Sequence, residues 1–116
     1  MAPPSDPRTI PLRPAVHHIL LALARGDMHG LGIAEEIEAA SEGAVELGPG
    51  TLYRSLAEMA GAGIVRLVPA PTSGADPRRK YYGITAEGRE LLARETARLE
   101  RLVQTARARQ AAPERA

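Results

Sequence analysis

The chain has 116 residues and a formal net charge of +1, and it contains no cysteine, tryptophan or phenylalanine. This length fits one domain with a modest core, at a size where dimerisation often adds stability. Without cysteine there are no disulfides, thiolate metal sites or thiol nucleophiles. No apolar run could span a bilayer and the N-terminus lacks a signal-peptide pattern, so a cytoplasmic protein with no membrane partner is expected.

The charges are unevenly distributed along the chain. Between Asp27 and Ala62 there are seven acids and one base, Arg54, whereas from Arg78 onward ten bases outnumber five acids. A chain divided in this way can present a basic face to a polyanion while remaining almost neutral overall.

The first segment is rich in proline. Residues 1–13 show little periodicity and are predicted to be a flexible arm.

A helix is predicted over Pro14–Arg25, because apolar residues recur there at helical spacing and Gly26 follows. His17 and His18 are adjacent and point about 100° apart on a helix, which disfavours a shared metal ion. They are expected to be partly exposed at a subunit contact.

A turn over 27–32 and a second helix are predicted next. Its inward residues are expected to be Ile33, Ile37 and Ala40. Its outer face is acidic and would be repelled by phosphates, so this helix should support the next one instead of reading bases. His29 is expected to cap the turn by bonding to backbone.

The helix predicted over 51–62 has a buried stripe and a polar face. The stripe comprises Leu52, Leu56, Met59 and Gly63. Glycine and proline at 48–50 precede the helix, and Gly61 and Gly63 end it. Polar, aromatic and basic groups at its N-terminus suit entry into a DNA major groove. An ordinary amphipathic packing helix is the alternative.

A β-hairpin is predicted from two β-rich runs, 64–68 and 81–84, joined by a turn-rich segment expected to form a mobile tip. Three consecutive bases precede Tyr81 and could hold phosphate or enter a minor groove. The alternative is a solvent-exposed hairpin edge whose charges prevent it from pairing with another strand. Tyr82 and Ile84 share a strand face, so Tyr82 should pack inward and Tyr81 should face outward.

Thr85 is a good N-cap for a long helix predicted over 86–109, with a disordered tail over 110–116. Its narrow apolar seam is expected to be buried in a second copy of the chain. Glu95 lies near this seam and is expected to pair with an arginine across it. The predicted homodimer interface comprises Val16, Leu20, Leu92, Leu99, Leu102, Val103 and Ala106.

This order of elements predicts a mainly α fold with a β-hairpin wing. A winged helix-turn-helix would span 14–85, followed by a dimerisation helix. Arg54 is the candidate for a guanine contact, with Glu58 as its intrahelical partner in the free protein. The predicted contacts to double-stranded DNA are Thr51, Tyr53, Arg54, Arg78, Arg79, Lys80 and Tyr81.

Six segments resemble the PadR family of bacterial transcriptional regulators, in its short form with a single C-terminal helix: 19–23, 28–33, 47–56, 63–65, 79–82 and 84–89. The resemblance implies a dimeric repressor on a pseudo-palindromic operator, often released by a small effector near the dimer interface. Two features depart from the family. Leu31 stands where the family commonly has tyrosine, and no tryptophan is present to stack a planar drug. A small aliphatic or charged effector, or none, fits better.

Other classes of function have less support. There is no metal-spaced histidine pair or phosphate-cradling glycine loop, so the chain is predicted not to be an enzyme and to use no metal or cofactor. A winged-helix protein-interaction module that does not bind DNA is the main alternative. A different family of winged-helix repressors is a further one.

Overall fold

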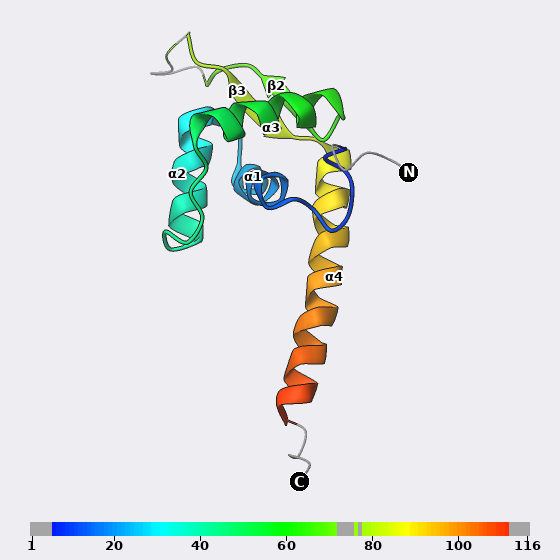
Figure 1. Ribbon diagram of the computed structural model, residues 1–116. Helices are drawn as coiled ribbons and strands as arrows, with labels where there is room; N and C mark the ends of the chain where they lie inside the picture. Colours follow the sequence, from blue (N-terminus) through cyan, green and yellow to red (C-terminus); the bar gives the residue numbers. More distant parts are fainter. Residues whose placement is uncertain (1–5, 72–75, 77, 112–116) are drawn as a thin grey trace.

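The structure is a computed structural model that describes residues 6–71, 76 and 78–111. Within these ranges the elements are α1 (Pro14–Arg25), β1 (Met28–His29), α2 (Gly30–Ala40), α3 (Pro49–Gly61), β2 (Val65–Val68), β3 (Tyr81–Ile84) and α4 (Ala86–Ala111). In Figure 1, α1 lies between α2 and α4, with α3 and the sheet across one end. The predicted fold class, mainly α with a β-hairpin wing, is confirmed.

Helix α1 is the centre of the core and has the predicted bounds. It contacts α2, α3, α4 and β3. Val16, Ile19, Leu20 and Leu23 have no exposed surface at all. Val16 and Leu20 therefore have no surface left for a second copy, although they were expected at the dimer interface.

Helix α2 begins where His29 caps it. The His29 Nδ1 atom accepts the backbone N–H of Gly32 at 3.0 Å, so the expected backbone bond of this histidine is confirmed. Ile33 and Ile37 are buried, but Ala40 is exposed, contrary to expectation, because it is the last residue of the helix.

A short strand, β1, lies where only a turn was predicted. Met28 pairs with Tyr82 and His29 with Tyr81, so β3 is the central strand of an antiparallel sheet ordered β1-β3-β2. Two residues are too few to show a strand period, and their pairing partners are more than 50 residues away. Sequence periodicity could not have found this strand.

Helix α3 begins at Pro49, two residues before the predicted start, with Gly48 as its N-cap. Leu52, Leu56 and Met59 are buried as predicted. Gly63 does not belong to the buried stripe: it is exposed and has φ +78°, a left-handed turn after the helix end.

Strands β2 and β3 form the predicted hairpin. Leu67 pairs with Tyr82 and Val68 with Tyr81. Tyr82 belongs to the core, as expected. Tyr81 is outside the core cluster but is covered, with 9% of its surface exposed, because its ring packs edge-on against His29. Most of the expected mobile tip, 72–75 and 77, lies outside the described residues.

Helix α4 is joined firmly to the hairpin at its N-terminus. The Thr85 hydroxyl accepts the N–H of Gly88 at 3.0 Å and donates to the carbonyl of Gly63 at 2.7 Å, which confirms the predicted cap. A Cβ at Gly88 would collide with the backbone carbonyl oxygen of Ile64. The helix and the wing can approach this closely only because residue 88 is glycine.

Residues 6–13 pack onto the domain, whereas a flexible arm was expected over 1–13; residues 1–5 lie outside the described ranges. Leu12 is buried, and its N–H donates to Glu95 Oε2 at 2.8 Å. Glu95 is 2% exposed, and its Oε1 accepts from Arg98 Nε at 2.5 Å. Glu95 is thus satisfied within its own chain, and the expectation that it pairs across a dimer seam is wrong.

The second half of α4 projects away from the rest of the chain (Figure 1). Every residue from 100 to 111 is exposed. The helix continues through residues 110 and 111, where a tail was predicted, and 112–116 lie outside the described ranges.

Candidate nucleic-acid interface

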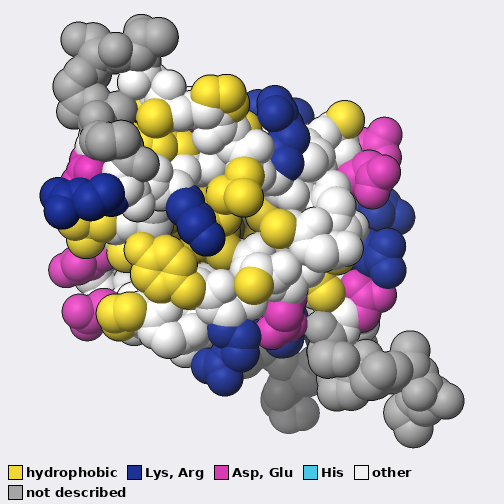
Figure 2. Space-filling view, turned by 90° about the horizontal axis from the view of Figure 1, so that it is seen from above, with side chains coloured by type: hydrophobic (Ala, Val, Ile, Leu, Met, Phe, Trp, Pro, Cys, Tyr) yellow, Lys and Arg dark blue, Asp and Glu magenta, His cyan; other side chains and the backbone are white. Residues whose placement is uncertain are grey.

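One face of the molecule is formed by α3 and the sheet. Figure 2 looks down on this face. Lys and Arg side chains surround a group of hydrophobic side chains near its middle, and acidic side chains lie mostly toward its edges. The distribution is what a surface facing a polyanion requires.

The N-terminal half of α3 exposes three of the predicted contacts on this face. Leu52 and Leu56 point into the core, so helical geometry turns Thr51, Tyr53 and Arg54 outward. No side chain caps this end of α3. The backbone N–H groups of its first turn are therefore open to an acceptor such as phosphate.

Arg54 is not paired with Glu58, contrary to the sequence-based expectation. The Glu58 carboxylate accepts from Arg13 at 2.9 Å, which joins the segment before α1 to α3. Arg54 makes no ion pair with any residue in the described part of the chain. Its guanidinium is exposed at the start of the helix and available to an acceptor.

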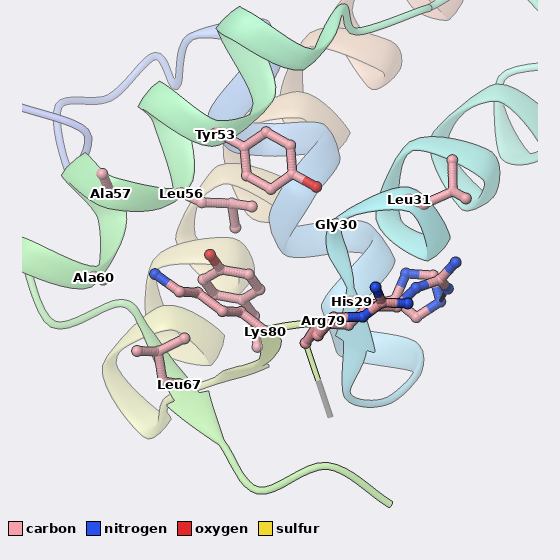
Figure 3. A pocket seen from close by; sticks show the side chains of 12 residues that line it. His29, Gly30, Leu31, Tyr53, Leu56, Ala57, Ala60, Leu67, Arg79 and Lys80 are labelled. Atoms are coloured by element: carbon pink, nitrogen blue, oxygen red, sulfur yellow. Dashed lines mark hydrogen bonds between the residues drawn. The ribbon is translucent and has the colours of Figure 1, made fainter. Parts of the chain in front are cut away.

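Tyr53 lies over the first residue of α2. A Cβ at Gly30 would collide with the Tyr53 hydroxyl and the adjoining ring carbons. Figure 3 shows the Tyr53 ring reaching from α3 toward Gly30. The glycine therefore sets the position of an exposed aromatic ring that sequence analysis placed in the DNA-contacting set.

The wing brings its three predicted bases to the same face, all of them exposed. Arg78 pairs with Asp76 through Nε at 3.2 Å, and its hydrogen bonds lower the pKa of the Asp76 carboxyl. Such an exposed pair contributes little to stability and is easily exchanged for a phosphate. Lys80 makes no ion pair with any described residue. Tyr81 is covered by its contact with His29, so its ring is not free on this face.

His29 lies between two hydrogen-bond donors. Its Nδ1 atom accepts from Gly32, and its Nε2 atom lies 2.8 Å from Nη1 of Arg79. A neutral imidazole has one acceptor nitrogen and one N–H, so it can accept only one of these two bonds. The ring accepts from Gly32 in one tautomer and from Arg79 in the other, so Gly32 and Arg79 compete for a single acceptor. Arg79 is therefore held only weakly by this contact.

A cavity of about 630 Å³ lies between α2, α3 and the wing. Leu67 pairs with the core residue Tyr82 across the hairpin, yet it is 58% exposed, which its place in the strand did not predict. Leu31, on α2, is 53% exposed. The cavity is lined by His29, Gly30, Leu31, Tyr53, Leu56, Ala57, Ala60, Leu67, Arg78, Arg79, Lys80 and Tyr82.

The predicted dimer residues on α4 lie along one side of the helix. Leu92 and Leu99 are half-buried, and Leu102, Val103 and Ala106 are exposed. Leu99 and Val103 also line a groove with His17 and Leu21 of α1. Leu21 was not among the residues predicted at the dimer interface. It is exposed because Ile19, Leu20 and Leu23 occupy the core-facing positions of α1.

His17 and His18 are both partly exposed, and their ring centroids lie 5.7 Å apart. Burial, followed by the neighbouring His18, lowers the pKa of His17. No group of three His, Asp or Glu side chains in the described ranges could hold a metal ion. None of the described helices is both long and apolar enough to cross a bilayer.

A helix-turn-helix closed by a small sheet, with an exposed helix N-terminus beside a basic hairpin, defines the winged helix-turn-helix class. Residues 19–94 match the profile of the transcriptional regulator PadR-like family. The chain belongs to this family, as the resemblance in its sequence suggested.

Solved structures from several organisms share the fold. A transcriptional regulator from Clostridium thermocellum is 25% identical, with a TM-score of 0.66 over 79% of this chain and 85% of that one. A PadR-like transcriptional regulator from Bacillus cereus is 21% identical, with a TM-score of 0.68 over 84% and 91%. A PadR family regulator from Clostridium difficile is 23% identical, with a TM-score of 0.64 over 79% and 95%.

Among curated proteins, an uncharacterised 37.1 kDa protein in a transposon of Streptomyces fradiae is 40% identical over 84 residues. The match takes in 72% of this chain and 22% of that protein. The chain thus spans about a fifth of the length of this curated relative.

Proposed function

We propose that the protein is a dimeric, sequence-specific DNA-binding regulator that acts as a repressor. In this proposal α3 enters the major groove and the wing contacts the adjacent backbone. Such a regulator works in the cytoplasm, on a pseudo-palindromic operator.

The observation that carries the proposal is an exposed Arg54 on α3 together with exposed bases on the wing. Arg54 is the single base between Asp27 and Ala62, and it lies unpaired within the described residues on the exposed side of α3. Arg79 and Lys80 are exposed on the wing, and they line the cavity together with Tyr53, the neighbour of Arg54 on α3. A guanidinium at a helix N-terminus suits bidentate bonding to guanine, and flanking bases suit phosphates.

Exposed apolar side chains on α4 support the proposed dimer. Leu102 and Val103 are 53% and 47% exposed on a stretch of helix that projects from its own chain. A helix projecting alone into water is marginally stable, and covering its seam with a second copy would stabilise it. Two reading helices related by a twofold axis would then meet half-sites about one turn of DNA apart, roughly 34–36 Å.

A gel-shift experiment tests the proposal. The DNA around the protein's own gene is compared with unrelated DNA of equal length, with non-specific competitor present. Preferential retardation of the first fragment is expected, and Arg101→Ala should behave like the wild type because Arg101 lies on the far side of α4 from the apolar seam. Equal binding to both fragments would contradict specific reading, and a folded dimer that retards neither would favour the protein-interaction alternative.

A further inference from the structure

The cavity between α2, α3 and the wing contains features that base reading does not require. Its walls are largely apolar, and two of its side chains, Leu31 and Leu67, are more than half exposed. Its volume of about 630 Å³ is within the usual range for small-molecule sites, roughly 300–1,000 Å³. Exposed apolar surface gathered into a hollow is a common mark of a ligand site.

Two of the three tyrosines of the chain, Tyr53 and Tyr82, line this one cavity. Tyr53 reaches over it from α3, and Tyr82 lies beneath it on the central strand. Burial raises the pKa of the Tyr82 phenol above its usual value of 10, at which the group is already neutral near pH 7. The apolar part of a small ligand would lie between aromatic and aliphatic side chains from α2, α3 and the wing.

The charged side chains that line the cavity are all basic among the described residues. Arg78, Arg79, Lys80 and His29 contribute to its lining, and no aspartate or glutamate does. Figure 3 shows Arg79 and His29 together at one end, with Leu56 and Leu67 on opposite sides of Lys80. A bound molecule with a negative head would meet complementary charge.

The contact between His29 and Arg79 provides an anchor for such a head. Nε2 of His29 and Nη1 of Arg79 lie 2.8 Å apart, and the other ring nitrogen, Nδ1, lies 3.0 Å from the N–H of Gly32. In the tautomer in which Nδ1 accepts from Gly32, an oxyanion beside these two atoms can accept from both Nε2–H and the guanidinium, which gives two charge-assisted hydrogen bonds.

We infer that this cavity binds a small amphiphilic organic anion, with its apolar body between α3 and the wing and its oxyanion head between His29 and Arg79. The same surface is the proposed reading face, so an occupied cavity and bound DNA exclude each other. That consequence rests on the proposed function, whereas binding of the anion does not.

Octanoate is the probe, with 1-octanol and octylammonium as controls of equal chain length. The full-length protein is titrated without DNA, and tyrosine fluorescence is followed; there is no tryptophan to mask it. Saturable binding of octanoate is expected, about ten-fold tighter than that of 1-octanol, since the alcohol cannot form the charge-assisted hydrogen bond. Octylammonium should bind more weakly than 1-octanol.

Two variants locate the site. Arg79→Gln should weaken octanoate about ten-fold and leave 1-octanol unchanged. Ala60→Leu narrows the cavity and should weaken both, whereas Ala39→Leu, a matched change on α2 outside the cavity, should weaken neither. Three outcomes would each overturn the inference. They are octanoate affinity unchanged by Arg79→Gln and Ala60→Leu, equal affinity for octanoate and 1-octanol, and no saturable octanoate binding to the folded protein.

A DNA competition separates this inference from the proposed function. Octanoate should release the promoter fragment in a gel-shift, and release should need more octanoate with Ala60→Leu. Specific DNA binding without octanoate binding defeats the inference alone. Octanoate binding with the expected variant pattern but no DNA binding defeats the proposed function and leaves the site standing.

Discussion

Nη2 of Arg13 lies 2.9 Å from Oε2 of Glu58, so the acid one turn beyond Arg54 forms its ion pair with a base from the segment before α1. Glu58 is therefore not the partner of Arg54, and it neither neutralises nor restrains that side chain. The reading face keeps a positive charge near the N-terminus of α3 because the segment before α1 folds back to meet the end of that helix.

Replacing Arg54 with alanine should cost about 1–3 kcal/mol on the specific site and relax base preference, because alanine cannot form the bidentate bonds to guanine. Titrations on the specific fragment and on single-base variants measure both effects. Arg54→Lys is the informative control, since lysine retains the charge but not the planar fork. Equal weakening on every sequence would mean that Arg54 contacts phosphate only.

The bases of the wing should set the salt dependence of DNA binding. Replacing both Arg79 and Lys80 with glutamine should reduce the slope of log K against log salt by about 0.9 for each phosphate that the wing no longer neutralises. The slope is measured from titrations over a range of salt concentrations. An unchanged slope would remove the wing from the proposed interface.

A charge on the exposed seam of α4 should abolish dimerisation. Leu102 is 53% exposed in the single chain, so Leu102→Asp should leave the fold intact while a carboxylate prevents burial against a second copy. Sedimentation should show monomers, and operator binding should be lost with them. Ala108→Asp, on the opposite side of the same exposed stretch, should remain dimeric. A dimeric Leu102→Asp variant would refute this seam.

Glu95 should make part of the stability depend on pH. Its hydrogen bond with Arg98, and then the N–H of Leu12, lower the pKa of this buried carboxyl below its usual value of 4.5. A lowered folded-state pKa contributes stability that is present above about pH 4.5 and is lost as pH falls through the folded value. Glu95→Gln should therefore reduce the unfolding free energy by about 1–3 kcal/mol at neutral pH, and by less in acid.

Denaturant unfolding at several pH values measures this difference. Glu100→Gln is the matched control, because Glu100 is exposed on the same helix. A constant difference between wild type and Glu95→Gln down to strongly acid pH would show that the charge of Glu95 does not stabilise the fold.

Replacing Gly30 and Gly88 with alanine should have different effects on stability and DNA binding. At Gly30 the new methyl meets the end of the Tyr53 side chain, which is half-exposed and can move. Gly30→Ala should change thermal stability little but weaken DNA binding by displacing that ring. At Gly88 the methyl meets the Ile64 carbonyl, which cannot move freely, so Gly88→Ala should cost about 1–3 kcal/mol of stability. Unaltered DNA binding by Gly30→Ala would show that the position of Tyr53 is unimportant.

The helices and the wing were predictable because their signals are local. Apolar residues at helical spacing predicted α1 with its correct bounds, and they placed α3 to within two residues at its start and one at its end. Leu52 and Leu56 had to face the core, which left Thr51, Tyr53 and Arg54 outside. Much of the candidate site follows from these periodicities alone.

The remaining features depend on segments that are distant in sequence. Arg13 and Glu58 are 45 residues apart, His29 and Arg79 are 50 apart, and Leu12 and Glu95 are 83 apart. Periodicity shows which side of a helix or strand is buried, but not which distant side chain will lie against its exposed side. The amino-acid sequence by itself therefore determined the class of fold, the family resemblance and the outward set on α3. Only the tertiary structure decided that Glu58 turns to Arg13, that Tyr81 is covered, and that α2, α3 and the wing enclose a cavity, because these outcomes arise when separate elements pack together.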